Sequence, residues 1–119
     1  MKRSLILLSL LVLILTLSSC TNTDPQDFIG DWKFDSIERN GEPAEASNDH
    51  RKFTVSIKED KTFLVVINGS NLIGKWETHQ SDSITLLSES LGEPLLDIIF
   101  ENEKIYYEIG KARYYFVRQ

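Results

Sequence analysis

The sequence predicts an all-β protein: a small antiparallel up-and-down barrel of about eight strands, after an N-terminal signal peptide helix. Three observations support this fold class. Apolar and polar residues alternate with a period of two through most of residues 28–119, as they do in half-buried strands. Turn-forming residues interrupt the alternation at short intervals. Outside the connection 40–51, no segment shows the apolar period of a helix. This number and spacing of strands favours a barrel, with a two-sheet sandwich as the alternative.

The expected strands follow one another along the chain with polar turns between them. In the clearest, Phe53, Val55 and Ile57 alternate with polar residues. Asn68-Gly69 is a strong hairpin signal, because both residues tolerate the positive φ of a two-residue turn. The longest connection, 40–51, fits either a short helix or a flexible loop. The expected strands are 30–38, 53–57, 63–67, 72–78, 84–87, 95–101, 105–109 and 113–118.

The first twenty residues have the three blocks of a secretory signal: Lys2-Arg3, an apolar stretch over 5–17, and small residues before a cleavage site. Leu17-Ser18-Ser19-Cys20 resembles the lipobox of bacterial lipoproteins, which implies lipidation of Cys20. The division expected is a signal peptide at 1–19, a tether at 20–27 and the folded domain at 28–119. A cleavable signal without lipidation and an ordinary buried cysteine are the alternatives.

Lipidation of Cys20 would anchor the mature chain to a membrane without spanning it, which predicts a protein of the cell envelope. Thr21, in place of the Asp that resembles an inner-membrane retention signal, favours the outer membrane, facing the periplasm or the cell surface. The whole chain has a net charge of −5, and loss of Lys2 and Arg3 leaves the mature part at −7. This acidity argues against nucleic acid as a partner.

Residues that carry catalysis or bind cofactors form no recognisable constellation in the sequence. His50 and His79 fall in expected loops without another metal-ligating residue at a suitable spacing. No serine lies in a Gly-x-Ser-x-Gly context, and there is no glycine-rich phosphate loop. The sequence therefore predicts a non-enzymatic protein with no cofactor and no metal site.

The domain opens with Gly30-Asp31-Trp32 and contains a second motif of this kind, Gly74-Lys75-Trp76-Glu77, before a final aromatic strand. This pattern after a lipobox resembles the short lipocalin-like lipoproteins of Bacteroidetes-type bacteria. The resemblance implies that Gly30 and Trp32 close one end of the barrel. It also implies that an arginine of the last strand packs over Trp32, with Arg118 a better match than Arg113.

Aromatic residues are numerous for a domain of this size, and two interpretations of them remain open. They could simply fill the core, or they could line a cavity for one small apolar ligand, as an eight-stranded barrel can. In the second case Phe53, Phe63, Trp76 and Tyr107 are the expected lining. In the first, the filled barrel would be a scaffold whose surface binds a protein, as an inhibitor or an envelope assembly factor.

Overall fold

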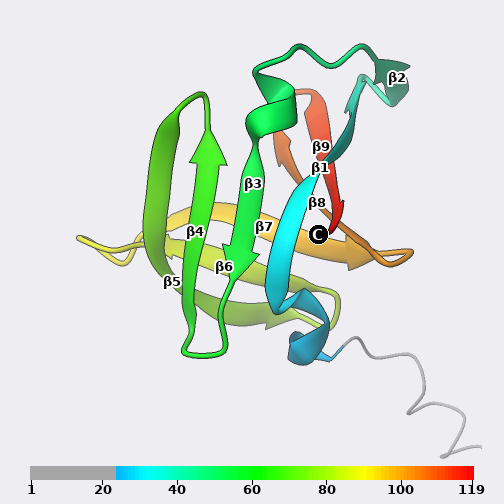
Figure 1. Ribbon diagram of the computed structural model, residues 1–119. Coiled ribbons are helices and arrows are strands. Elements are labelled where there is room, and N and C mark those ends of the chain that lie inside the picture. The colour runs from blue at the N-terminus through cyan, green and yellow to red at the C-terminus, as the bar shows by residue number, and fades with distance from the viewer. Residues whose placement is uncertain (1–23) are drawn as a thin grey trace, which may run out of the picture.

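The computed structural model describes residues 24–119, which form an antiparallel β-barrel (Figure 1). The predicted signal peptide (1–19) and the predicted lipidation site, Cys20, lie outside the described residues. A single 3-10 turn, η2, precedes the first strand, and a second, η3, lies in the longest connection. The elements are η2 (Pro25–Phe28), β1 (Gly30–Arg39), β2 (Glu42–Ala44), η3 (His50–Lys52), β3 (Thr54–Ile57), β4 (Thr62–Ile67), β5 (Ser70–Gln80), β6 (Ser83–Ser88), β7 (Pro94–Glu101), β8 (Lys104–Ile109) and β9 (Ala112–Arg118).

Eight strands close the barrel in simple up-and-down order. From β3 to β9 each strand pairs with the next along the chain, and β1 pairs with both β3 and β9. The β1–β9 ladder runs from Trp32 opposite Arg118 to Arg39 opposite Ala112, interrupted by a bulge at Asp35. The pairing of first and last strands makes one closed sheet, which confirms the barrel and rules out the sandwich.

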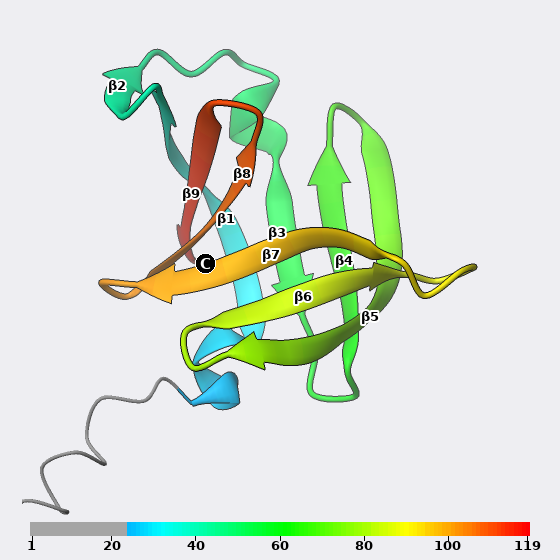
Figure 2. The ribbon, with the colours of Figure 1, turned by 180° about the vertical axis from the view of Figure 1, so that it is seen from behind.

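Strand β5 turns a corner and joins the two halves of the barrel. Its first part pairs with β4, its second part pairs with β6, and Gly74 belongs to both ladders. A Cβ atom at Gly74 would collide with the Leu87 carbonyl oxygen and the Phe63 ring. Glycine is therefore required where the backbones approach so closely. Beyond the corner, β5, β6 and β7 cross the direction of β3 and β4 (Figure 2).

The connection between β1 and β3 differs from both forms expected for it. Its first part is the short strand β2, which pairs with the end of β1 through Ile37–Arg39. Asn40 and Gly41 form the intervening turn with φ values of 54° and 80°. Its last part is η3, which lies over one end of the barrel (Figure 1). The segment 24–27, expected to be tether, also has structure, because η2 is capped by the Asp24 side chain.

The core fills the barrel interior with side chains from alternating positions of every long strand. On β4, Phe63 and Val65 are buried, whereas Thr62, Leu64 and Val66 on the outer face are half-buried. This alternation follows from the pleat of the strand, which sends successive side chains to opposite faces. The fully buried members include Trp32, Val55, Val65, Ile84, Leu86, Ile98, Ile105, Tyr107 and Phe116.

Candidate functional site at the His50 end of the barrel

One end of the barrel is sealed by the residues around the first and last strands. The Trp32 indole Nε1 donates to the Phe28 carbonyl at 2.9 Å. The Arg118 guanidinium donates to the carbonyls of Ile29 at 2.8 Å and Asp27 at 2.5 Å, and its central carbon lies 4.3 Å from the Trp32 ring centroid. These hydrogen bonds and the cation–π contact hold η2 across this end of the barrel. A ligand therefore cannot enter the barrel from this end.

Gly30 allows this closure. Its φ is +140°, and a Cβ atom there would lie 2.8 Å from the Arg118 Nη1. A side chain would therefore both strain the backbone and displace the arginine. The sequence analysis named Gly30, Trp32 and Arg118 together, and the structure brings these three residues together.

At the opposite end several inward-facing apolar side chains are only partly buried, as Ile29 and Phe100 are at the sealed end. The residues concerned are Phe34, Ile67, Leu72 and Tyr114. A surface cleft of about 260 Å³ lies beside this end, between η3 and the β4–β5 turn, lined by Asp49, Lys52, Asn68 and Gly69.

His50 covers this end as the first residue of η3. Its ring lies 5.3 Å from Phe53, 5.8 Å from Tyr114 and 6.0 Å from Phe34, measured between ring centroids. Two hydrogen bonds to Ser47 hold the turn: the Ser47 N–H donates to His50 Nδ1 at 3.1 Å, and the His50 N–H donates to Ser47 Oγ at 3.2 Å. We call His50 and these three aromatic residues the aromatic cap.

Tyr107 lies beneath the aromatic cap. Its ring centroid is 5.4 Å from that of Tyr114 and 5.3 Å from that of Phe116. The side chain is fully buried, and its hydroxyl has no hydrogen-bond partner among the described residues. Burial raises the pKa of Tyr107 above its ordinary value near 10, with a smaller contribution from Tyr114. A buried hydroxyl without a hydrogen-bond partner lowers the free energy of unfolding by about 1–3 kcal/mol. Such groups are therefore uncommon in folded proteins unless a ligand or water supplies the hydrogen bond.

The four residues expected to line a ligand cavity all face the barrel interior, and each is at most 3% exposed. They do not form one group. Phe53 belongs to the aromatic cap, and Tyr107 lies beneath it. Trp76 lies instead beside the β3–β4 turn, where its Nε1 donates to the Lys58 carbonyl at 2.8 Å and the Lys61 ammonium lies 3.9 Å from its ring centroid. Phe63 borders a separate cleft of about 300 Å³ near that turn.

His50, Phe34 and Tyr114 complete the aromatic cap, although the sequence did not predict them as site residues. The sequence predicts a loop at His50, because no period runs through 40–51. One local signal does exist: His50 and Phe53 are three residues apart, so a single helical turn brings them together, and the Phe53 N–H donates to the His50 carbonyl at 3.0 Å.

Within residues 24–119, no group of three His, Cys, Asp or Glu side chains is placed to hold a metal ion. In the same part of the chain, no helix has both the length and the apolar character needed to cross a membrane. Comparisons of this chain with protein-family models, with curated proteins and with solved structures find no match.

Proposed function

We propose that this chain is a lipocalin-like lipoprotein of the cell envelope that binds one small, largely apolar ligand under the aromatic cap. The observation that carries the proposal is the Tyr107 hydroxyl, which is buried in an apolar barrel and has no partner within the described residues. A ligand with a hydrogen-bonding group near this hydroxyl would supply the hydrogen-bond partner that it lacks. Rings of the cap would contact the apolar remainder of the ligand.

The shape of this end limits the kind of ligand. The surface cleft beside the aromatic cap has a volume of about 260 Å³, which is below the range of about 300–1,000 Å³ for small-molecule sites, so the ligand has to be small. Lys52 and Asp49 in this cleft favour a ligand with a polar group that stays near water. A small amphipathic molecule fits these features better than a large lipid.

The ligand is tested with residues 21–119, because every strand of the ladder and the whole described core lie within them. Native mass spectrometry of this protein, made in a bacterial host, should show a small-molecule adduct. Anilinonaphthalene sulfonate, an apolar probe with one acidic group, should bind saturably at one site. Absence of both an adduct and saturable probe binding would refute the proposal and favour the filled scaffold.

Two tyrosine variants identify the site. Tyr107→Phe removes only the buried hydroxyl and should weaken binding of the co-purified ligand about fivefold to tenfold, as loss of one hydrogen bond of about 1 kcal/mol does. Tyr115→Phe, on the outer face of β9, is the matched control and should leave the affinity unchanged. Equal affinities for wild type and Tyr107→Phe would contradict a ligand bound through this hydroxyl.

The anchor is a separate part of the proposal, supported by Leu17-Ser18-Ser19-Cys20 and by Thr21 after it. Cells that express the full chain should incorporate a fatty-acid probe into this protein, and Cys20→Ala should abolish the label. The wild-type protein should fractionate with the outer membrane. Equal labelling of the two proteins would rule out Cys20 as the lipidated residue.

A further inference from the structure

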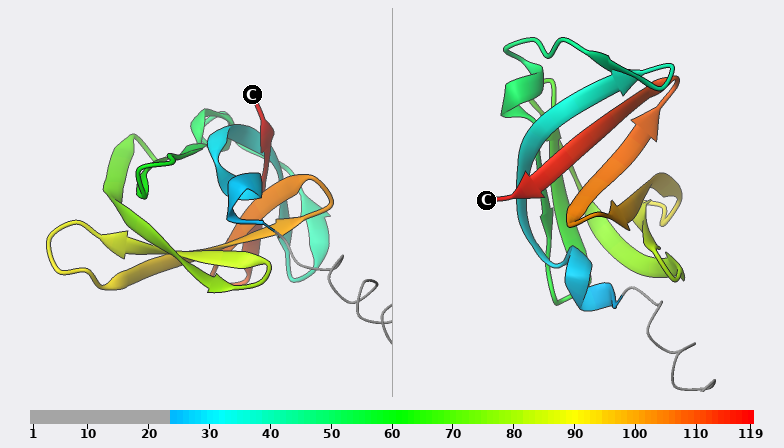
Figure 3. Two further views of the ribbon diagram at one scale, coloured as in Figure 1. Left: turned by 90° about the horizontal axis from the view of Figure 1, so that it is seen from below. Right: turned by 90° about the vertical axis from the view of Figure 1, so that its right-hand side faces the viewer.

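The ladder between β7 and β8 is short, and the two strands part beyond it. They are joined by Asn102 and Glu103, whose φ values of 54° and 64° are those of a two-residue hairpin turn. Only three residue pairs follow, from Glu101–Lys104 to Ile99–Tyr106. Farther from the turn, β7 stays with β6 and β8 stays with β9, so a gap opens between them (Figures 2 and 3).

Main-chain hydrogen-bonding groups face this gap. In a two-residue hairpin the residues flanking the turn exchange main-chain hydrogen bonds, and so does every second pair beyond them. Here those pairs are Glu101–Lys104 and Ile99–Tyr106, so Asp97 and Glu108 would be next. Their N–H and C=O groups therefore point into the gap without a ladder partner within residues 24–119.

The hydrogen bonding of β7 on its other side, toward β6, agrees with this direction of the Asp97 N–H group. The N–H of Phe100 points away from the gap and donates to the Asp82 carbonyl at 3.0 Å. Asp97 is an odd number of residues away and therefore points its N–H to the other edge.

Apolar side chains of β7 border the gap. A cleft of about 290 Å³ between β7 and β8 is lined by Leu95, Leu96, Asp97, Ile99 and Glu108. A second cleft, of about 370 Å³, lies between Leu95 and Ile73 of β5. The exposed large hydrophobic side chains of the described residues are Ile73, Leu91, Leu95 and Ile109, with Leu95 41% and Ile109 45% exposed. They lie on β5, β7, β8 and the β6–β7 turn.

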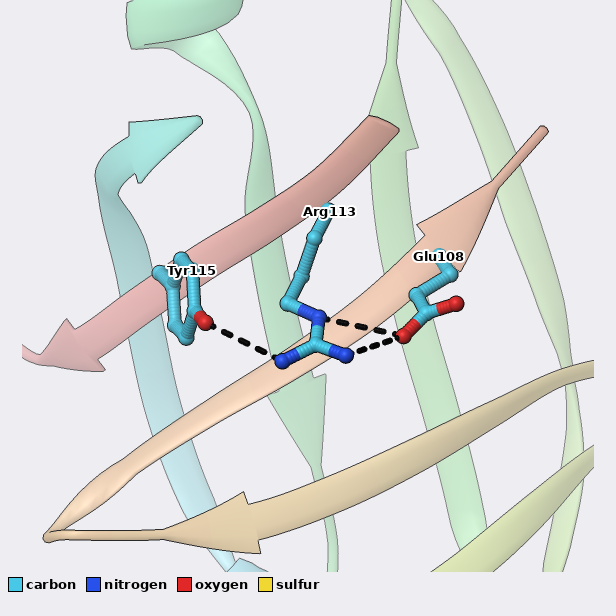
Figure 4. A network of polar contacts seen from close by, with 3 residues as sticks. All are labelled: Glu108, Arg113 and Tyr115. Atoms are coloured by element: carbon cyan, nitrogen blue, oxygen red, sulfur yellow. Dashed lines mark hydrogen bonds and ion pairs between the residues drawn. The ribbon is translucent and has the colours of Figure 1, made fainter. Parts of the chain in front are cut away.

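The charge around this edge is acidic. The sequence from Trp76 to Glu103, which covers the second part of β5 and all of β6 and β7, contains Asp and Glu but no Lys or Arg. Nearby cations on β8 and β9 are already engaged. Lys104 pairs with Asp35 at 2.8 Å, and Arg113 holds Glu108 at 2.6 Å and the Tyr115 hydroxyl at 3.3 Å (Figure 4). Opposite charge therefore identifies a basic partner.

We propose that the edge of β7 over residues 94–98 binds an extended basic peptide segment of a protein partner as an added strand. Main-chain hydrogen bonds to the Asp97 edge supply affinity, and alternate side chains of the peptide supply specificity. Apolar side chains of the peptide contact Leu95, and its Lys or Arg side chains meet the acidic sheet. A second copy of this chain is disfavoured, because it would bring two acidic edges together. This inference does not depend on the ligand site under the aromatic cap.

The test uses residues 21–119 and a synthetic peptide of three Lys-Val repeats. The peptide should bind saturably and protect the amide of Asp97, on the β7 edge, from hydrogen exchange. Asp97→Lys should weaken binding at least about tenfold through like-charge repulsion. Glu59→Lys, in the β3–β4 turn, makes the same change in net charge and should alter affinity less than twofold.

Methylated peptides separate strand addition from simple charge attraction. N-methyl groups on alternate residues remove the donors along one edge of the peptide. N-methylation of the peptide edge that faces β7 should abolish binding. N-methylation of the opposite edge should leave the affinity unchanged. Four results would overturn the proposal: no saturable binding, equal binding of both methylated peptides, protection of other amides instead, or formation of a homodimer through this edge.

Discussion

The Arg118 guanidinium lies over the Trp32 indole ring, with its central carbon 4.3 Å from the ring centroid, and joins the last strand of the barrel to the turn that precedes the first. The same guanidinium donates to the carbonyls of Asp27 and Ile29. One side chain thus closes the β1–β9 seam and holds η2 across the sealed end.

Replacement of Arg118 by alanine should lower the free energy of unfolding by about 2 kcal/mol. The loss combines one cation–π contact with two hydrogen bonds from a charged donor, partly offset because water reaches the site. Urea unfolding of residues 21–119 measures this change. Arg51→Ala, at an exposed position of η3, is the control and should change stability by less than about 0.5 kcal/mol. Equal losses in the two variants would show that the Trp32 contact contributes nothing.

Gly30→Ala should destabilise the fold by more than Gly41→Ala. Both glycines have positive φ values, +140° and +80°, but only at Gly30 would the new Cβ atom meet a side chain, the Arg118 guanidinium. Backbone strain alone costs about 1 kcal/mol, and displacement of Arg118 should add about as much again at Gly30. Thermal unfolding of the two variants compares them directly. A smaller loss at Gly30 than at Gly41 would contradict the closure described for this end.

Tyr107→Phe should stabilise the ligand-free protein by about 1 kcal/mol, because it removes a buried hydroxyl without a partner in the described structure. The free energy of unfolding of this variant should also depend less on pH in the alkaline range than that of the wild type. Burial raises the pKa of Tyr107 in the folded protein above its ordinary value near 10, so the folded state holds this proton more tightly than the unfolded chain. This contribution to stability is complete below about pH 10 and is lost as the pH rises further.

Urea unfolding of wild type and Tyr107→Phe from pH 8 to pH 11 measures both effects. The wild-type free energy of unfolding should fall above pH 10 more steeply than that of the variant. Tyr106 also has a raised pKa through burial, so part of the slope should remain in Tyr107→Phe. Parallel pH profiles, or a variant less stable than wild type at pH 8, would show that the hydroxyl has a partner in the folded protein.

His50→Ala should loosen the aromatic cap without unfolding the barrel. The His50 ring contacts Phe34, Phe53 and Tyr114, all at the end of the barrel opposite η2, whereas His79 is exposed on β5. Hydrogen exchange of the η3 amides should be faster in His50→Ala, and amides of β6 should keep their protection. His79→Ala should match wild type throughout. Unchanged η3 exchange in His50→Ala would show that the ring does not hold this turn in place.

The strands could be predicted well from sequence because their signals are local. Phe53, Val55 and Ile57 alternate with polar residues, and Asn68-Gly69 has the positive φ values, 51° and 75°, that a tight hairpin needs. The segment 40–52 could not be predicted in the same way. Its strand β2 exists because the end of β1 offers a free edge, and η3 is positioned by aromatic contacts with residues of other strands.

The candidate site shows the same division. Phe53 and Tyr107 could be named as inward-facing from alternation alone, but so could Phe63 and Trp76, which lie toward the other end of the barrel. Alternation identifies the face of a strand on which a side chain lies. It does not state the height of that side chain in the closed barrel, because height depends on the register between strands far apart in sequence.

Periodicity and turn residues are enough to predict the all-β class and the order and approximate limits of eight strands, and motif resemblance adds the association of Gly30, Trp32 and Arg118. All three signals can be read in short windows of sequence. The closed fold is needed to show that η2 seals one end, that His50 covers the other, and that β7 and β8 part at Asp97 and Glu108. Each of these depends on closure of the ladder, which brings the two ends of the domain together and fixes which side chains meet across the barrel.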